Sequence, residues 1–309
     1  MILETIEDFE LFKSNSHGDW IIHIVPIDPE CHPRETSISL LFIRTIASNQ
    51  DYCYAFNHPD SKSSIDRSTF LKFLTENENN KWTLDKKSLS QCLELQNLFD
   101  LNLSSFLLDN VTHKADEFIT TAHKLIKRQT NDAAELNKII PLMKHLESFQ
   151  SLCDKMVKSI CQVDIQFLII NNMVLDSLSI LEKNGIFVDS EIFKKYYSVV
   201  PNKDGLVFSQ YNIYTSTGRP SNRFGGVNYA ALNASNGCRA AFRSRYGNNG
   251  KLVVIDYTAF HPRIICLLTK YRLDVDVNIY EYLAKLYFQK KQVDHIDIAE
   301  SKKITFRQL

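Results

Sequence analysis

The feature that most constrains this chain is a long stretch without acidic residues that ends at a single carboxylate. No Asp or Glu occurs from Gly205 to Ile255, although the chain carries 36 acidic and 36 basic residues. Seven of the nine glycines lie in this stretch, and Asp256 follows it directly after the apolar segment Leu252–Ile255. Its basic side chains are Arg219, Arg223, Arg239, Arg243, Arg245 and Lys251. This pattern indicates a cationic, turn-rich surface beside one carboxylate, and an ordinary basic surface loop is the alternative.

Composition sets the class of protein. A chain of 309 residues with 44% hydrophobic and 23% charged residues is long enough for two globular domains. The seven cysteines are widely spaced and form no CxxC pair, which argues against a disulfide framework or a zinc site and favours a reducing, cytoplasmic compartment. No apolar run approaches the roughly 18 residues of a membrane span, and the N-terminus does not resemble a signal peptide.

Hydrophobic periodicity divides the chain into a sheet-forming start and a helical middle. Short apolar runs bounded by polar residues or proline predict the first strands, and helical spacing predicts the following segments. The predicted strands are Trp20–Pro26, Ser37–Ile46 and Tyr52–Phe56, and the predicted helices are Asp66–Glu76, Ser88–Phe99 and Asn131–Lys158.

The second half of the chain combines helices, short strands and turns. An amphipathic helix with Leu175, Leu178 and Leu181 is predicted to stop at Asn184-Gly185, and Asp189 is predicted to cap the next helix. Leu252–Ile255 is predicted to be a buried strand. Three further helices are predicted, at Ala259–Lys270 with Pro262 in its first turn, at Tyr280–Phe288 and at about Asp297–Leu309.

Four segments resemble motifs of the family A (DNA polymerase I-like) DNA polymerases, in the family's order and spacing. Thr217–Ser221 (TGRPS) is similar to its TGR segment, and Val227–Asn233 to its Asn-rich primer-template strand. Arg239–Phe242 matches the R-x-x-F before motif A, and Ile255–Arg263 resembles motif A itself, usually written DYSQIELR. The resemblance covers roughly Leu181 to Leu309 and is nearest to short phage-type members. It implies a DNA-directed DNA polymerase of the bacterial cytoplasm.

The resemblance assigns roles to individual residues. Asp256 and the carbonyl of Tyr257 would bind the two magnesium ions that nucleotidyl transfer needs about 4 Å apart. Primer-template DNA would contact Thr217, Arg219, Asn228, Asn233, Arg239 and Arg263. Because the family's contacts are mostly to phosphate, sugar and minor groove, they should not discriminate between sequences. A carboxylate among them would repel the duplex, in agreement with the acid-free stretch.

The chain departs from the family at two points. His261 stands where the family has the glutamate that senses the sugar 2′-position, so discrimination between deoxy- and ribonucleotides is expected to be lost or achieved differently. The alternative is a partly buried histidine in the first turn of a helix. The last helix resembles the start of motif B, in which Lys302 would neutralise the incoming dNTP and Phe306 would shape the base pocket. The motif's arginine falls on Ile298, and Lys303, Lys290 or Lys291 would replace it; a solvated helix face is the alternative for Lys302 and Lys303.

Two parts of the family have no counterpart before Leu309, namely the motif B tyrosine and the second metal-binding aspartate. The sequence therefore predicts an incomplete polymerase chain or a primer-template-binding subunit of a split polymerase, whose second chain supplies the rest. We expect the chain alone not to extend a primer.

The N-terminal part resembles the 3′–5′ exonuclease domain that often precedes the polymerase in this family. Asp28 and Glu30 resemble its metal-binding D-x-E, and Asp100 lies in a segment similar to a later motif, but a third motif is missing. We expect a degenerate domain, with an active exonuclease as the alternative. The predicted α/β chain thus comprises an exonuclease-like (RNase H-like) domain at 1–160, a reduced thumb at 161–205, half a palm at 206–272 and the start of the fingers at 273–309.

Overall fold

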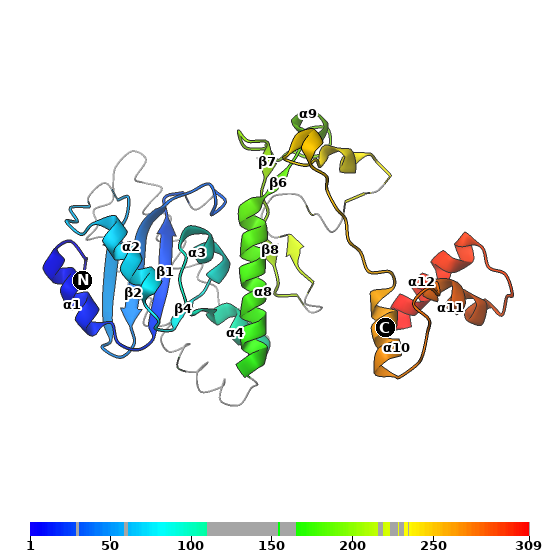
Figure 1. Cartoon of the computed structure of the whole chain (residues 1–309), viewed down its shortest axis with the longest axis horizontal. Coiled ribbons are helices and arrows are strands. Elements are labelled where there is room, and N and C mark those ends of the chain that lie inside the picture. The colour runs from blue at the N-terminus through cyan, green and yellow to red at the C-terminus, as the bar shows by residue number, and fades with distance from the viewer. Residues whose placement is uncertain are drawn as a thin grey trace. The chain divides into compact units, whose positions relative to one another are not determined.

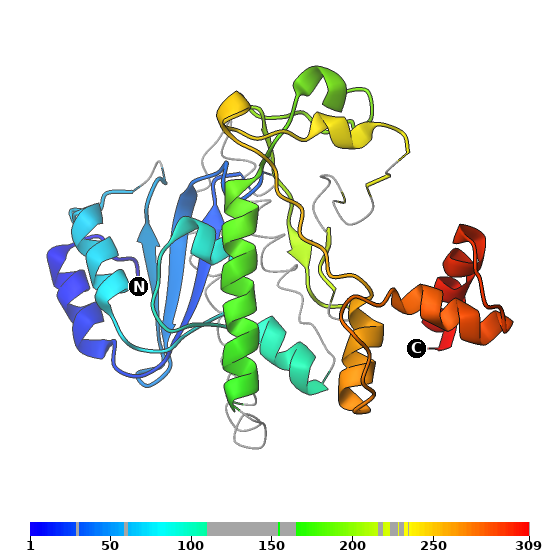
Figure 2. The same ribbon diagram turned by 45° about the vertical axis from the view of Figure 1, so that its right-hand side comes forward.

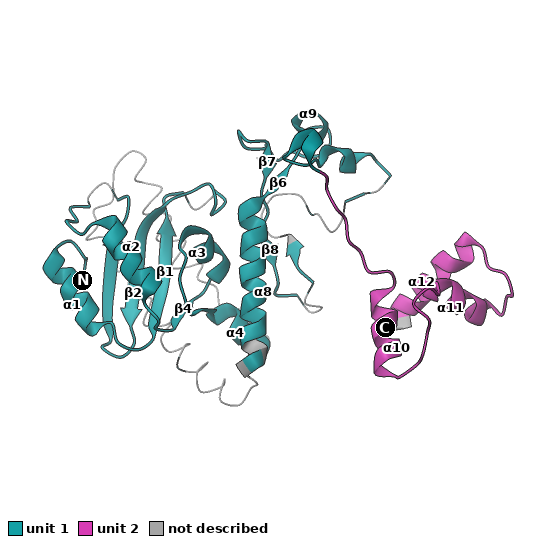
Figure 3. Ribbon diagram, in the orientation of Figure 1, with its two compact units in different colours: residues 1–250 teal, residues 251–309 magenta. Residues whose placement is uncertain are grey.

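The computed structural model describes residues 1–28, 31–58, 61–109, 154, 165–215, 219–222, 228, 232–233 and 235–308. It forms two compact units, Met1–Gly250 and Lys251–Leu309 (Figure 3). The division falls inside the segment 206–272, so residues of the predicted palm occur in both units. The four predicted domain boundaries stay predictions.

The first unit is built on a five-stranded sheet with the order β3-β2-β1-β4-β5 (Figure 1). Neighbouring strands β1, β2 and β3 are antiparallel, whereas β4 pairs parallel with β1 and β5 parallel with β4. This arrangement is that of an RNase H-like sheet, which confirms the predicted fold class. The strands are β1 (Trp20–Pro26), β2 (Ile38–Thr45), β3 (Gln50–Ala55), β4 (Lys81–Thr83) and β5 (Leu98–Asp100).

The core of this sheet is aromatic and joins two helices to the strands. Every residue of β2 is buried, including Ser39, Arg44 and Thr45, which flank its apolar stretch Leu40–Ile43. The ring centroid of Phe12 in α1 (Ile6–Asn15) lies 5.6 Å from that of Trp20 in β1 and 6.4 Å from that of Phe70 in α2 (Arg67–Glu76). Both helices begin at a capping side chain; in α2 the predicted first residue, Asp66, accepts from the Thr69 N–H.

The prediction of one helix over Ser88–Phe99 is wrong. Helix α3 (Lys86–Cys92) ends early, and the chain turns through Asn97 at a φ of 51° into strand β5. Leu98 and Phe99 pair with Lys81 and Trp82 of β4. Sheet pairing therefore overrides the helical spacing. Helix α4 (Leu101–Asp109) follows β5, and the predicted helix Asn131–Lys158 lies outside the described residues except at Asp154.

Helix α8 (Ile165–Asn184) packs against α3 and leads into the smaller second part of this unit (Figure 2). It ends at Asn184 as predicted, and Gly185 adopts the left-handed φ of 60°. Leu175 and Leu178 are buried, whereas Leu181 is exposed. The elements that follow are β6 (Ile186–Phe187), α9 (Ser190–Phe193) capped by Asp189 as predicted, β7 (Leu206–Val207), β8 (Tyr211–Asn212), β9 (Ser221–Asn222), η4 (Cys238–Ala241) and η5 (Gly247–Asn249).

The second unit contains the three predicted helices, α10 (Phe260–Leu268), α11 (Ile279–Phe288) and α12 (His295–Gln308). Pro262 lies in the first turn of α10, as predicted. The prediction of a buried strand at Leu252–Ile255 is wrong, since these side chains are 54–89% exposed and belong to no strand. A strand needs a neighbour to take up its N–H and C=O groups, and no described strand pairs with this segment. No helix within the described residues is long and apolar enough to cross a lipid bilayer.

Candidate functional site

Five of the six residues predicted to hold primer-template DNA lie in the first unit, and Arg263 lies in the second. Arg219, Asn228, Asn233 and Arg239 are solvent-accessible, and Thr217 lies outside the described residues. Arg219 comes two residues before β9, in the hairpin that β8 and β9 form.

Two of these residues also shape their own loop. The Asn233 side-chain oxygen accepts from the Ser235 N–H at 2.8 Å, and the Arg239 guanidinium donates to the Leu232 carbonyl at 3.1 Å. Asn233 and Arg239 are therefore exposed to solvent and also hold their own loop in place. A nucleic-acid strand bound here would contact a loop whose conformation these hydrogen bonds restrict.

A buried glutamate, to which no sequence motif assigned a role, anchors the β8–β9 hairpin. The Glu182 side chain of α8 is fully buried and forms an ion pair with Lys87 of α3. It also accepts from Gln91 Nε2 at 2.9 Å and from the Tyr211 N–H of β8 at 2.7 Å, while Lys87 donates to the Tyr211 carbonyl. Burial raises the pKa of Glu182, and the charge of Lys87 opposes that rise. The sequence signal was the position of Glu182, four residues after Leu178 and seven after Leu175, on the helix face that buries both leucines. A carboxylate on that face requires a cation and N–H donors.

Asp256 lies in the second unit, on the exposed extended segment before α10. It ends no strand, although its position after an apolar run and before a helix suits either a strand end or a helix cap. The N-cap of α10 is Ala259, with a φ of 53°. Within the described residues, no group of three or more His, Cys, Asp or Glu side chains is arranged to hold a metal ion. Mg²⁺ often takes only one or two carboxylates and completes its shell with substrate phosphates and water, so Asp256 with the Tyr257 carbonyl fits this ion.

The three residues predicted to contact the nucleotide come together in the second unit. The His261 ring of α10 lies 6.3 Å from the Phe306 ring of α12, and the Phe306 ring lies 6.4 Å from that of Tyr280 in α11. The Lys302 ammonium lies 5.6 Å from the centre of the Tyr280 ring. His261 is exposed, so the alternative of a partly buried histidine does not hold. Tyr280 was not predicted as a site residue; its spacing on α11 only indicated a helix.

Three other cations of the second unit to which the sequence gave a role, Arg263, Lys290 and Lys303, are already engaged. The guanidinium of Arg263, predicted to bind DNA, donates to the carbonyls of Thr258 (3.1 Å), Val275 (2.8 Å) and Val277 (3.0 Å). It therefore ties the loop before α11 to the start of α10. Among the predicted substitutes for the motif B arginine, Lys290 forms an ion pair with Asp297 (2.8 Å) and Lys303 with Glu300 (3.0 Å).

The predicted exonuclease carboxylates do not form one site among the described residues. Asp28 is exposed beyond the end of β1 and accepts from the Cys31 thiol at 3.2 Å, while Glu30 lies outside the described residues. Asp100 ends β5, which β4 separates from β1, and its two carboxylate oxygens accept from the N–H groups of Lys86 and Leu103, each at 2.8 Å. Burial raises its pKa to about 7. Asp100 thus accepts hydrogen bonds from the first turns of α3, whose N-cap is Asp85, and of α4.

The comparison with solved structures agrees with this architecture, whereas the two sequence comparisons found no match. No family model matches the sequence, and no curated protein matches it. The POL domain of Pol1 from M. smegmatis, solved in complex with DNA primer-template and dNTP, superposes with a TM-score of 0.73 at 12% identity, over 99% of this chain and 70% of that one. A nuclease in its apo form (TM-score 0.37, 11% identity, 52% of this chain and 82% of that one) and the RNase D of Trypanosoma brucei (0.30, 13%, 40% and 52%) are too distant to carry an argument. The chain therefore has the fold of a DNA polymerase domain.

Proposed function

We propose that this chain acts in template-directed DNA synthesis, where it holds primer-template DNA and an incoming dNTP. The observation that carries the proposal is the proximity of the His261 ring to the Phe306 ring, while Phe306 and Lys302 both approach Tyr280. Motif comparison assigned His261, Lys302 and Phe306 to the nucleotide from two separate segments, and the two helices α10 and α12 bring these segments together. An ordinary solvated helix face would not require that convergence.

Each group has a chemical task in this proposal. The Lys302 ammonium, which projects from an exposed position on α12, neutralises the triphosphate. The Phe306 ring, 45% exposed, offers an apolar face to the base, and His261 beside it meets the sugar edge in place of the family's glutamate. Since an imidazole is less acidic than a carboxyl and differs from it in shape, selection between ribose and deoxyribose is expected to differ from that of the family.

The DNA surface works through charge rather than base recognition. Arg219 and Arg239 are exposed in a stretch that has no acidic residue to repel phosphates. Asn228 and Asn233 present amide groups suited to sugar and minor-groove contacts. Asp256 and the Tyr257 carbonyl are the groups that would hold Mg²⁺, which when bound supplies charge neutralisation at the reacting phosphate.

The nucleotide half of the proposal is tested by titrating the full chain with a fluorescent dATP analogue. Lys302→Ala is expected to weaken binding about tenfold, since it removes a charge-assisted interaction. Lys303→Ala is the matched control, because it lies next to Lys302 on α12 but is paired with Glu300. Equal affinities of the two variants would remove the nucleotide site from α12.

The DNA half is tested with a labelled primer-template duplex. Arg219→Gln combined with Arg239→Gln is expected to lower both the affinity and its salt dependence, by about 0.9 in the logarithmic slope for each phosphate that is no longer neutralised. Primer extension by the same preparation then separates the two functions that the sequence predicts. Extension supports a polymerase, and tight binding without extension supports a primer-template-binding subunit that acts with a second chain.

A further inference from the structure

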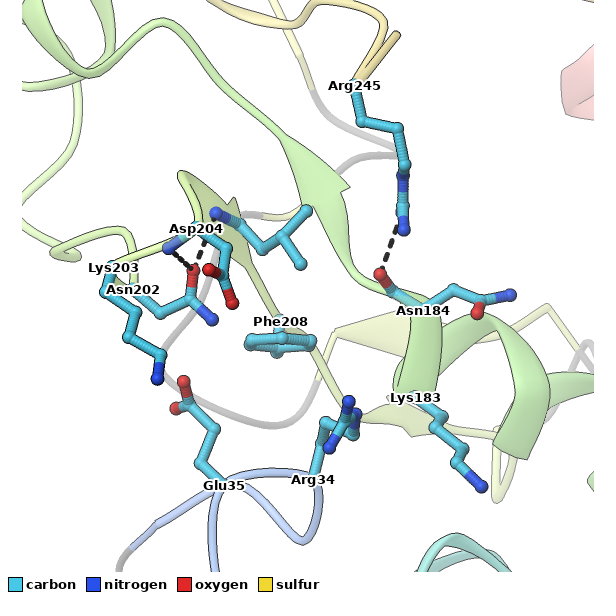
Figure 4. Close-up of a pocket in the computed structure, with 10 residues that line it drawn as sticks. Arg34, Glu35, Lys183, Asn184, Asn202, Lys203, Asp204, Phe208 and Arg245 are labelled. Atoms are coloured by element: carbon cyan, nitrogen blue, oxygen red, sulfur yellow. Dashed lines mark hydrogen bonds between the residues drawn. The ribbon is translucent and has the colours of Figure 1, made fainter.

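A cationic pocket of about 740 Å³ lies in the first unit, lined by residues to which motif comparison assigned no role (Figure 4). Four of its lining side chains are basic and two are acidic, which leaves an excess of two positive charges. They are Arg34, Lys183, Lys203, Arg245, Glu35 and Asp204. Pockets of this size hold nucleotide-sized ligands.

The walls of the pocket come from separate segments that hydrogen bonds hold in place. The Asn202 side-chain oxygen accepts from the N–H groups of Asp204 and Leu206, both at 2.9 Å, and so fixes the turn that carries Lys203. The Arg245 guanidinium donates to the carbonyls of Asn184 (2.8 Å) and Gly185, at the end of α8. Figure 4 shows the Arg34 and Glu35 side chains on the opposite side. The pocket is thus largely preformed, which lowers the entropic cost of binding.

The floor of the pocket is apolar and uncharged. Phe208, 8% exposed, is stacked on the buried His32 with 5.0 Å between the ring centroids. Burial lowers the pKa of His32 to about 4, so this histidine is neutral near pH 7. One face of the Phe208 ring is covered by His32, and the ring edge approaches Gly185 so closely that a Cβ there would lie 2.7 Å from it. A nucleobase therefore has little ring surface to stack on, and the rim cations are the groups available to a ligand.

We propose that this pocket binds the phosphate groups of a nucleotide, either a free deoxynucleoside triphosphate or a segment of single-stranded DNA. Phosphate oxygens match the excess of guanidinium and ammonium groups at the rim, and the apolar floor strengthens their field by excluding water. Such a site lies outside the proposed polymerase surface and would give the exonuclease-like part of the chain a binding role without catalytic carboxylates.

The test uses the full chain carrying Lys302→Ala, Arg219→Gln and Arg239→Gln, so that the surfaces of the proposed function are weakened beforehand. Into this background we introduce Arg34→Gln with Lys203→Gln. The matched control is Lys194→Gln with Lys195→Gln, which changes the charge equally at two exposed positions of the same unit outside the pocket. The pocket and control positions are all exposed, and thermal unfolding checks that each variant is folded.

Binding is measured with labelled dATP and with labelled (dT)12 over a range of salt concentrations. The pocket variant is expected to bind one or both probes roughly tenfold more weakly than the control, with a salt slope for (dT)12 lower by about 1.4 if two phosphates are no longer neutralised. Weaker binding of dATP alone assigns the site to free nucleotide, and weaker binding of (dT)12 identifies a strand. A second variant, Glu35→Gln with Asp204→Asn, is expected to bind several-fold more tightly, because it removes the repelling charges.

Three outcomes overturn the proposal. They are equal binding by the pocket variant and the control, no tightening when the two acids are neutralised, and no binding of either probe by the background chain. None of these depends on Lys302, Arg219 or Arg239, so the pocket and the proposed polymerase surface succeed or fail separately.

Discussion

Substitution of Lys87 by methionine tests how the β8–β9 hairpin is attached to the sheet domain. Lys87 is 14% exposed and pairs with the fully buried Glu182, so the variant leaves a carboxylate without its cation. Breaking a buried pair costs about 3–5 kcal/mol. Because Gln91 Nε2 and the Tyr211 N–H still donate to Glu182, we expect a cost near the lower end, about 3 kcal/mol.

The cost should also depend on pH. Burial already raises the pKa of Glu182, and removal of the opposing Lys87 charge raises it further. A carboxyl with a raised pKa binds a proton in the folded state that the unfolded state has released. Its contribution to the unfolding free energy is therefore complete below the unfolded pKa and is lost as the pH rises through the folded one. The deficit of Lys87→Met should thus be larger at pH 8 than at pH 5.

Urea unfolding followed by tryptophan fluorescence measures this deficit selectively. The only two tryptophans, Trp20 and Trp82, both lie in the sheet of the first unit. With a slope of about 3 kcal/mol per molar urea or less, the midpoint should fall by about 1 M or more. Lys72→Met, at a position 72% exposed, is the control and should change the unfolding free energy by less than about 0.5 kcal/mol.

The reasoning would be refuted by a cost for Lys87→Met below about 1 kcal/mol, or by a cost that does not grow with pH. The double variant Lys87→Met with Glu182→Leu adds a further check. Because it removes the buried charge itself, it should restore part of the lost unfolding free energy. It should also abolish the pH dependence that Lys87→Met adds.

Three further predictions concern other interactions. Gly185→Ala should lower the unfolding free energy by about 2 kcal/mol or more, measured by the same urea assay, because the residue has a φ of 60° and its Cβ would lie 2.7 Å from the Phe208 ring. Burial raises the pKa of Asp100 to about 7, so the unfolding free energy of the parent chain should fall by at most about 4 kcal/mol as the pH rises from 4 to 7. In urea titrations over this pH range, Asp100→Asn should make the unfolding free energy less dependent on pH. Arg263→Gln should loosen the second unit by about 1–3 kcal/mol, seen as faster amide exchange in α10 and α11, because three carbonyls would be deprived of their guanidinium donor.

Several predictions from the sequence needed no knowledge of distant residues. The runs WIIHIVP and SISLLFIRTI form β1 and β2 almost at the predicted bounds, and the Asn184-Gly185 stop and the Asp189 cap are both found. These features depend on local effects alone. Glycine adopts a positive φ without strain, and a side-chain oxygen can accept from the first N–H groups of a helix.

The tertiary structure decided what depends on partners far along the chain. Strand β5 forms because it pairs with β4. No described strand pairs with the apolar segment Leu252–Ile255, and this segment therefore stays extended and exposed. The candidate sites follow the same division. Sequence motifs named Lys302, Phe306 and His261, but only helix packing put His261 beside Phe306, and Lys302 and Phe306 beside Tyr280.

Burial decided the structural roles of two chemically similar carboxylates, Asp100 and Glu182. The sequence placed Asp100 in a segment similar to an exonuclease motif and assigned no role to Glu182, yet both are buried and bonded to main-chain N–H groups. The sequence by itself determined the α/β class, the approximate bounds of α2, α10, α11 and α12, and the acid-free cationic stretch, because local chemistry suffices for these. The role of each carboxylate came only with the fold, since desolvation and donor geometry depend on residues that sequence order does not bring together.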